Sequence, residues 1–90
     1  MHERADGSRT GRLRIAVFAG LAELAGSRTL EIDWRGGSVA ELRAAVAAAR
    51  PELLPLLSRS AVAVGDRHAD EAASVPVGAD VAILPPVSGG

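Results

Sequence analysis

Apolar and polar side chains alternate over residues 12–18, the first patterned stretch of the chain. Leu13, Ile15 and Val17 fall on one face, which is the period-two pattern of a β-strand with one buried side. Phe18 falls on the opposite face, where it is either an exposed aromatic side chain or one covered by a loop. We therefore predict a strand over residues 12–18 with a candidate surface aromatic at its end.

A second strand is predicted over residues 29–34, where Leu30, Ile32 and Trp34 share one face. Residues 21–26, between the two strands, carry leucines three positions apart and end in glycine, which predicts one short helical turn. Together these segments predict a hairpin with an elaborated loop.

The clearest helical signal begins at Ser38. Ser38 and Glu41 have the spacing of a capping box, in which each side chain accepts a hydrogen bond from the other residue's backbone N–H. Apolar residues then recur at helical spacing as far as Ala49, and Pro51 ends the pattern. The sequence predicts one main helix, preceded by a turn at residues 36–37.

The second half of the chain predicts short strands and turns. Residues 53–57 carry four leucines around Pro55, and we expect an irregular segment that caps the open end of the core. Residues 61–64 and 67–69 are expected to pair across a tight turn, and residues 81–84 to form a last strand. This order predicts an α+β fold in which a mixed sheet of about five strands packs on one main helix.

Composition and charge exclude several classes of protein. The chain is 48% hydrophobic, but much of this is alanine, so its 90 residues supply one thin aliphatic core without a large cofactor cavity. A net charge of −1 and the lack of a basic stripe argue against nucleic-acid binding. The lack of cysteine excludes disulfides and thiolate metal sites, and no apolar run is long enough for a membrane span. We expect a cytoplasmic protein.

The ends of the chain are expected to lie outside the folded domain. Residues 1–11 lack the apolar middle of a signal peptide and are expected to be a disordered extension. Residues 12–84 would form the domain, and residues 85–90 a flexible tail.

Conventional catalytic and metal-binding constellations are absent from the sequence. His68 has no cysteine or histidine partner, which indicates a surface histidine on a short strand, and no metal site is predicted. Ser38 and Glu41 are explained by helix capping, and no triad surrounds any serine. All ten basic residues are arginine, so no side chain of these residues forms a Schiff base or accepts an isopeptide bond as lysine does.

The last ten residues carry no charged side chain, and the last predicted strand, residues 81–84, runs directly into Pro85 and Pro86. Two prolines stiffen the exit from the sheet, and the small residues after them would fit a narrow channel. The terminal carboxylate of Gly90 is an acyl group that an enzyme could activate. The tail comprises Pro85, Pro86, Val87, Ser88, Gly89 and Gly90.

This ending, from Leu84 to Gly90, resembles the C-terminus of the small subunit of molybdopterin synthase, the MoaD type in the ThiS/MoaD family of ubiquitin-like sulfur carriers. The similarity runs from about Leu13 to Gly90 and includes Phe18-Ala19, Ser38-Val39 and residues 78–83. The resemblance implies a β-grasp fold, in agreement with the element order predicted above.

The resemblance also implies a function for Gly90. In the family, a ubiquitin-activating-type adenylyltransferase uses ATP to adenylate the terminal glycine, and a sulfur donor converts the acyl-adenylate to a thiocarboxylate. The tail then inserts into the large synthase subunit, and sulfur passes to cyclic pyranopterin monophosphate during molybdenum cofactor biosynthesis. The chain would bind no cofactor and would be a non-catalytic donor subunit, in a heterotetramer of two small and two large subunits.

The family pattern further implies a docking surface around the tail, formed by Phe18, His68 and Leu84. Two of these residues depart from the pattern. Leu84 stands where an aromatic residue often precedes the two prolines, and His68 stands where an apolar residue is common. Both departures make the expected interface less apolar.

Two other functions share this fold and the terminal Gly-Gly. One is a thiocarboxylate carrier for the synthesis of thiamine thiazole or of an amino acid such as cysteine. The other is an interaction module or protein modifier, in which Gly90 is joined to lysine residues of target proteins.

Overall fold

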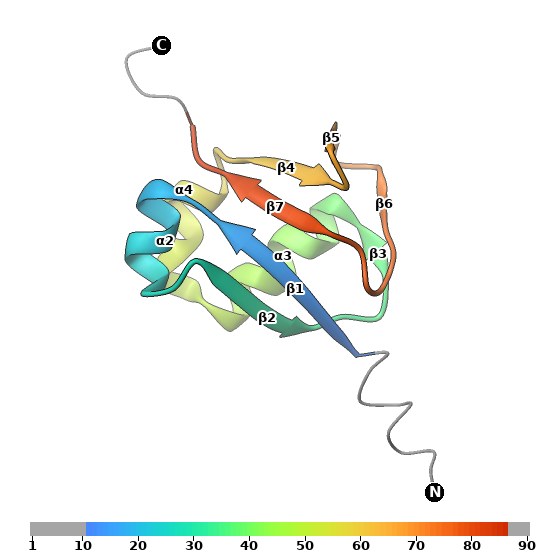
Figure 1. The fold of residues 1–90 in the computed structure, drawn as a ribbon, viewed down its shortest axis with the longest axis horizontal. Helices are drawn as coiled ribbons and strands as arrows, with labels where there is room; N and C mark the ends of the chain where they lie inside the picture. Colours follow the sequence, from blue (N-terminus) through green and yellow to red (C-terminus); the bar gives the residue numbers. More distant parts are fainter. Residues whose placement is uncertain (1–10, 87–90) are drawn as a thin grey trace, which may run out of the picture.

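The computed structural model describes residues 11–86, in which a five-stranded sheet packs on helices and a two-stranded sheet closes one end (Figure 1). Predictions for residues 1–10 and 87–90 lie outside the described residues. The elements in chain order are β1 (Arg12–Val17), α2 (Ala19–Ala25), β2 (Thr29–Asp33), β3 (Gly37–Ser38), α3 (Val39–Ala49), the 3-10 helix η1 (Pro51–Leu53), α4 (Leu54–Leu57), β4 (Ala61–Val64), β5 (Arg67–Ala69), β6 (Ser74–Val75) and β7 (Val81–Leu84).

The five-stranded sheet has the order β2-β1-β7-β4-β5. β1 and β7 run parallel in its interior, and every other neighbouring pair is antiparallel. Since β1 and β7 are the first and last strands of the described residues, the five-stranded sheet is complete only when these two strands have paired. The prediction of a mixed sheet of five strands on one main helix is confirmed.

The inner face of the sheet carries the alternating apolar residues that the sequence predicted. Leu13, Ile15 and Val17 are at most 1% exposed, and they belong to one core cluster with buried residues of α3. The core also includes Trp34, at 6% exposure, one residue beyond β2. Alternation in the strands and helical spacing in α3 therefore direct their apolar side chains into one shared core.

The leucine-rich segment after α3 is helical, and the prediction of an irregular segment was wrong. Pro51 lies in the first turn of η1 and Pro55 in the first turn of α4, where a missing N–H breaks no helical hydrogen bond. Leu53 and Leu57 are buried at 0% and 1% exposure, so the segment does close the core as expected. α2 is also longer than the single predicted turn, since it begins at Ala19.

β3 and β6 were not predicted from the sequence. Gly37 pairs with Val75 and Ser38 with Ser74, so Gly37 belongs to a strand and not to the predicted turn. Each strand has two residues, which is too short to show an alternating pattern.

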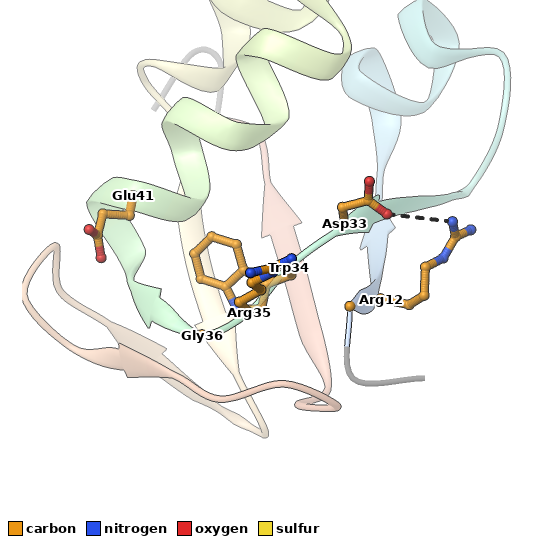
Figure 2. Close-up of a pocket in the computed structure, with 7 residues that line it drawn as sticks. Arg12, Asp33, Trp34, Arg35, Gly36 and Glu41 are labelled. Atoms are coloured by element: carbon orange, nitrogen blue, oxygen red, sulfur yellow. Dashed lines mark ion pairs between the residues drawn. The ribbon is translucent and has the colours of Figure 1, made fainter. Parts of the chain in front are cut away.

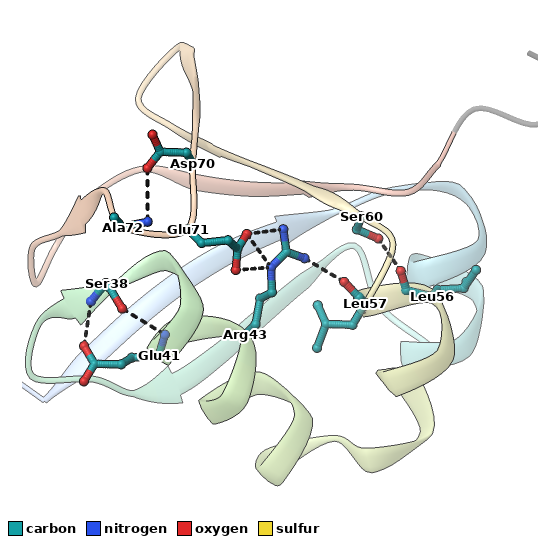
Figure 3. A network of polar contacts seen from close by, with 9 residues as sticks. All are labelled: Ser38, Glu41, Arg43, Leu56, Leu57, Ser60, Asp70, Glu71 and Ala72. Atoms are coloured by element: carbon teal, nitrogen blue, oxygen red, sulfur yellow. Dashed lines mark hydrogen bonds and ion pairs between the residues drawn. The ribbon is translucent and has the colours of Figure 1, made fainter.

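The segment 70–73 joins the second sheet to α3 (Figure 3). The capping box is confirmed, because the Ser38 hydroxyl accepts from the Glu41 N–H and the Glu41 carboxylate accepts from the Ser38 N–H. Arg43 of α3 donates to the Glu71 carboxylate at 2.9 Å and to the Leu57 carbonyl oxygen at 2.7 Å. One arginine thus connects three segments that are distant in sequence.

Candidate functional site

β7 leads directly to the C-terminal tail from the interior of the sheet. Its neighbours are β1 on one side and β4 on the other, and Pro85 and Pro86, the first two tail residues, follow the end of β7 (Figure 1). Pro85 is half-buried against the fold and Pro86 is exposed. Of the predicted tail residues, Val87, Ser88, Gly89 and Gly90 lie outside the described residues, so their role stays a prediction.

Phe18 and Leu84 lie side by side where the tail leaves the sheet. The parallel register pairs Val17 with Ile83, so the next residues along each strand are neighbours. Both side chains are on the outer face, opposite the core, by the alternation of the strands. Phe18 is 46% exposed, which confirms an exposed aromatic here, and Leu84 is half-buried.

His68 is exposed on the same outer face, two strands away from Leu84. Between it and β1 lies a row of alanines, because the register places Ala16 beside Ala82, Ala82 beside Ala63, and Ala63 beside His68. The structure therefore brings the three predicted docking residues to one face, and the small side chains of Ala16, Ala82 and Ala63 lie on the same face.

The alanines of the outer face were not singled out from the sequence. Ala16, Ala63 and Ala82 each lie between two apolar residues of their own strand, but which strands are adjacent is set by the topology. Only the register shows that Ala16, Ala63 and Ala82 form one row, in which Ala63 is 8% exposed.

The end of the outer face that is distant from the tail is charged. The Arg12 Nη2 atom lies 2.7 Å from Glu31 Oε1, and the Arg14 Nη2 atom lies 3.6 Å from Glu31 Oε2. The hydrogen bond from Arg12, and then its charge, lower the pKa of the Glu31 carboxyl below its ordinary value. The outer face is thus divided into a charged half on β1 and β2 and an apolar half beside the tail.

A hollow of about 630 Å³ lies near the start of β1, distant from the tail (Figure 2). Figure 2 shows Arg12 and Glu41 on either side of Trp34, with the charged groups spread around the ring and not converging on one point. Glu41 belongs to the capping box, and Arg12 contacts Asp33 and Glu31. These charges are used by the fold itself, so the hollow is not a candidate active site.

The described part of the chain holds neither a metal-binding cluster nor a membrane-spanning helix. Within residues 11–86, no three His, Asp or Glu side chains are grouped so as to hold a metal ion. None of the helices in this part has the length and apolar character needed to cross a membrane.

Comparisons with known proteins agree with this architecture. The model of the ThiS family matches residues 15–90. Small archaeal modifier protein 1 from Haloferax volcanii is 30% identical, with a TM-score of 0.75 over 89% of this chain and 100% of that chain. Subunit 1 of molybdopterin-converting factor from Helicobacter pylori, solved as a complex of subunits 1 and 2, is a further structural match.

The H. pylori match has 24% identity and a TM-score of 0.62 over 88% of this chain and 99% of that chain, so it supports the fold alone. No curated protein sequence matches the chain. The structural matches confirm the predicted β-grasp fold. Because the family model spans most of the sequence, from the middle of β1 to Gly90, the chain belongs to the ThiS family of ubiquitin-like proteins.

Proposed function

We propose that this chain is the sulfur-carrier subunit of molybdopterin synthase. The Gly90 carboxylate is adenylated, is converted to a thiocarboxylate, and donates its sulfur to cyclic pyranopterin monophosphate. A carboxylate is a poor acyl donor, so adenylation supplies the leaving group that sulfur then displaces. The chain carries the sulfur, and its partners supply the catalytic groups.

One structural observation supports this proposal most directly. The tail begins at an interior strand of the sheet and leaves it beside Phe18 and Leu84. A partner that binds the apolar half of the outer face therefore also meets the start of the tail. Docking of the folded domain would bring Gly90 into the partner's site and turn a bimolecular encounter into a local one. The uncharged side chains of the tail limit the cost of burying it.

The proposed partners are the large synthase subunit, a ubiquitin-activating-type adenylyltransferase that uses ATP, and a sulfur donor. The complex of subunits 1 and 2 of the H. pylori molybdopterin-converting factor supports the first of these. We also propose that the small and large subunits form a heterotetramer in the cytoplasm, and that this chain binds no cofactor.

Protein modification is the second candidate function, and a specific observation favours it. The 30% identity over nearly the whole chain is to a protein named as a modifier, which is higher than the identity to the molybdopterin-converting subunit. In that function Gly90 would be joined to lysine residues of other proteins. A sulfur carrier for thiamine thiazole or cysteine synthesis is a third candidate, which the family name supports.

Intact mass spectrometry of the untagged protein from its own host separates these functions. The proposal predicts replacement of one oxygen by one sulfur at Gly90, with discharge only when the large subunit and the pterin precursor are both present. The Gly90-deleted chain is the matched control, because it keeps every residue that the structure describes.

Two other results of this experiment would favour the other candidate functions. A thiocarboxylate that survives the large subunit and precursor would contradict the synthase assignment and favour the third candidate. A mass increase on other proteins equal to the mass of this chain less one water, with Gly90 joined to a lysine, would favour the modifier.

A further inference from the structure

Ala19 has a backbone conformation that alanine rarely adopts. Its φ angle is +49°, and among residues 11–86 it is the only non-glycine residue with a positive φ. In this left-handed region the Cβ atom approaches the neighbouring carbonyl oxygen, and alanine has no polar side chain to compensate. Such strain persists only where the surrounding structure imposes it.

Phe18 and Leu21, which flank Ala19 and Gly20, face in opposite directions. Phe18 is extended, with φ −135° and ψ 159°, and keeps its ring on the outer face with 46% exposure. Leu21 is 0% exposed and belongs to the core on the inner side. The chain therefore changes from strand to helix, and from outward to inward, over Ala19 and Gly20, and the left-handed turn falls at Ala19.

Contacts on both sides of Ala19 fix this junction. The Phe18 carbonyl oxygen accepts from the Leu21 N–H at 3.0 Å, and the Val17 N–H donates to the Arg28 carbonyl oxygen at 2.9 Å. Gly20 packs so closely on α4 that a Cβ atom there would lie 3.0 Å from Leu56 Cδ1. With its neighbours held, Ala19 takes up the remaining turn of the chain.

We propose that the left-handed backbone of Ala19 positions Phe18 for docking beside Leu84. The inference rests on the proposed function, since it takes Phe18 as a docking residue. A side chain that is held in its bound orientation loses less freedom on association, and this raises the affinity of the complex. Ala19 is thus a positioning residue that acts through its backbone, and its methyl group is not required.

Substitutions at Ala19 separate the backbone from the side chain. Glycine and asparagine tolerate the left-handed region, and the β-branched valine does not. Ala22→Val is the matched control for bulk, because Ala22 and Ala19 line the same shallow groove beside Phe18 and Ala22 lies within the regular helix.

The test measures the position of Phe18 and the binding of a partner. Phe18 is the only phenylalanine, so 4-fluorophenylalanine gives one ¹⁹F resonance, and Trp34 is the only tryptophan, so its fluorescence reports folding. The large molybdopterin synthase subunit of the same host is the binding probe. We expect Ala19→Gly and Ala19→Asn to keep the resonance and the Kd within about twofold, and Ala19→Val to shift the resonance and weaken binding by about tenfold or more.

Three outcomes would overturn the inference. Folded Ala19→Val could bind as the native chain does, or Ala19→Gly and Ala19→Asn could lose as much affinity as Ala19→Val. Ala19→Val could also fail to fold while Ala22→Val folds, which would make this backbone a requirement of the fold and not of docking. If the native chain itself does not bind the large subunit, the proposed function fails instead, and the ¹⁹F comparison still tests the placement of Phe18.

Discussion

The indole N–H of Trp34 donates a hydrogen bond of 2.9 Å to the carbonyl oxygen of Val75, 41 residues further along the chain. Trp34 follows β2, and Val75 belongs to β6. The bond therefore joins the first hairpin to the second sheet inside the core. The ring of Trp34, the single tryptophan, is buried in the core, and the bond to Val75 gives its indole N–H a polar partner there.

Trp34→Phe should lower the free energy of unfolding by about 1–3 kcal/mol, because the buried carbonyl of Val75 loses its donor and the smaller ring leaves a void. Urea denaturation followed by circular dichroism measures this. Thiocarboxylate formation at Gly90 should be unchanged, because Trp34 is distant from the tail. A loss below about 0.5 kcal/mol would show that water or a shifted backbone replaces the bond.

Gly37→Ala should destabilise the fold by about 1–3 kcal/mol through overpacking. A Cβ atom there would lie 2.6 Å from Glu41 Oε1 and 3.3 Å from the Trp34 ring, so the capping box must open. A double-mutant cycle with Glu41→Ala checks the cause. In the Glu41→Ala background the same glycine substitution should cost less, and equal costs in both backgrounds would exclude the carboxylate as the obstacle.

Stability should fall as the pH falls below the ordinary Glu pKa of 4.5, partly through Glu71. The hydrogen bond from Arg43, and then its charge, lower the pKa of Glu71 in the folded state. A lowered folded pKa stabilises the fold above the unfolded pKa, and this contribution is lost as the pH falls through the folded value. Glu71→Gln should therefore flatten the acid side of the profile.

Denaturation midpoints between about pH 3 and pH 7 measure this slope. Arg43→Gln is the matched control, since it removes the same pair from the other side. It should flatten the profile in the same way while also lowering stability at neutral pH, because the Leu57 carbonyl oxygen loses its donor. An unchanged acid slope in both variants would contradict the role of the pair.

Phe18→Ala should weaken binding to the large subunit with little loss of stability, because the ring is 46% exposed. Leu42→Ala is the contrasting variant, since Leu42 is 0% exposed in α3 and should cost about 2–5 kcal/mol. Calorimetric binding and thermal unfolding give the two quantities. A loss of about 3–5 kcal/mol for Phe18→Ala would mean that the ring acts as a core residue.

Deletion of Gly90, or addition of a C-terminal tag, should abolish sulfur transfer and leave the unfolding temperature unchanged. The buried core ends at Ile83, so none of the described residues after it supplies core packing. Circular dichroism and the synthase assay measure the two effects. Unfolding of the deleted chain would contradict a tail that is separate from the core.

Much of the fold follows from local pattern. The alternation around Ile15, the capping box at Ser38 and the turn after Val64 each involve neighbours in sequence, and each was predicted. The η1–α4 segment was missed because two prolines suggested irregular structure, although both occupy first-turn positions. β3 and β6 were missed because pairing of Gly37 with Val75 depends on contacts across the whole chain.

The candidate site divides in the same way. Alternation places Phe18 on the outer face but leaves open whether a loop covers it, and the structure shows the ring exposed. The role of the tail follows from its residue types and stays a prediction. The alanine row between Phe18 and His68 depends on which strands are neighbours, and the left-handed backbone of Ala19 depends on the packing of Gly20 and Leu21. Neither the alanine row nor the backbone conformation of Ala19 can be recognised from the residue types alone.

The parallel pairing of β1 and β7 has a mechanical consequence. When a partner grips the tail and holds the outer face, traction on Pro86 runs along the axis of β7. The hydrogen bonds to β4 are perpendicular to this axis and those to β1 are slanted across it, so both sets share the load in shear and do not open one after another. In the proposed function, this arrangement would let the domain withstand repeated threading and withdrawal of the tail without unravelling.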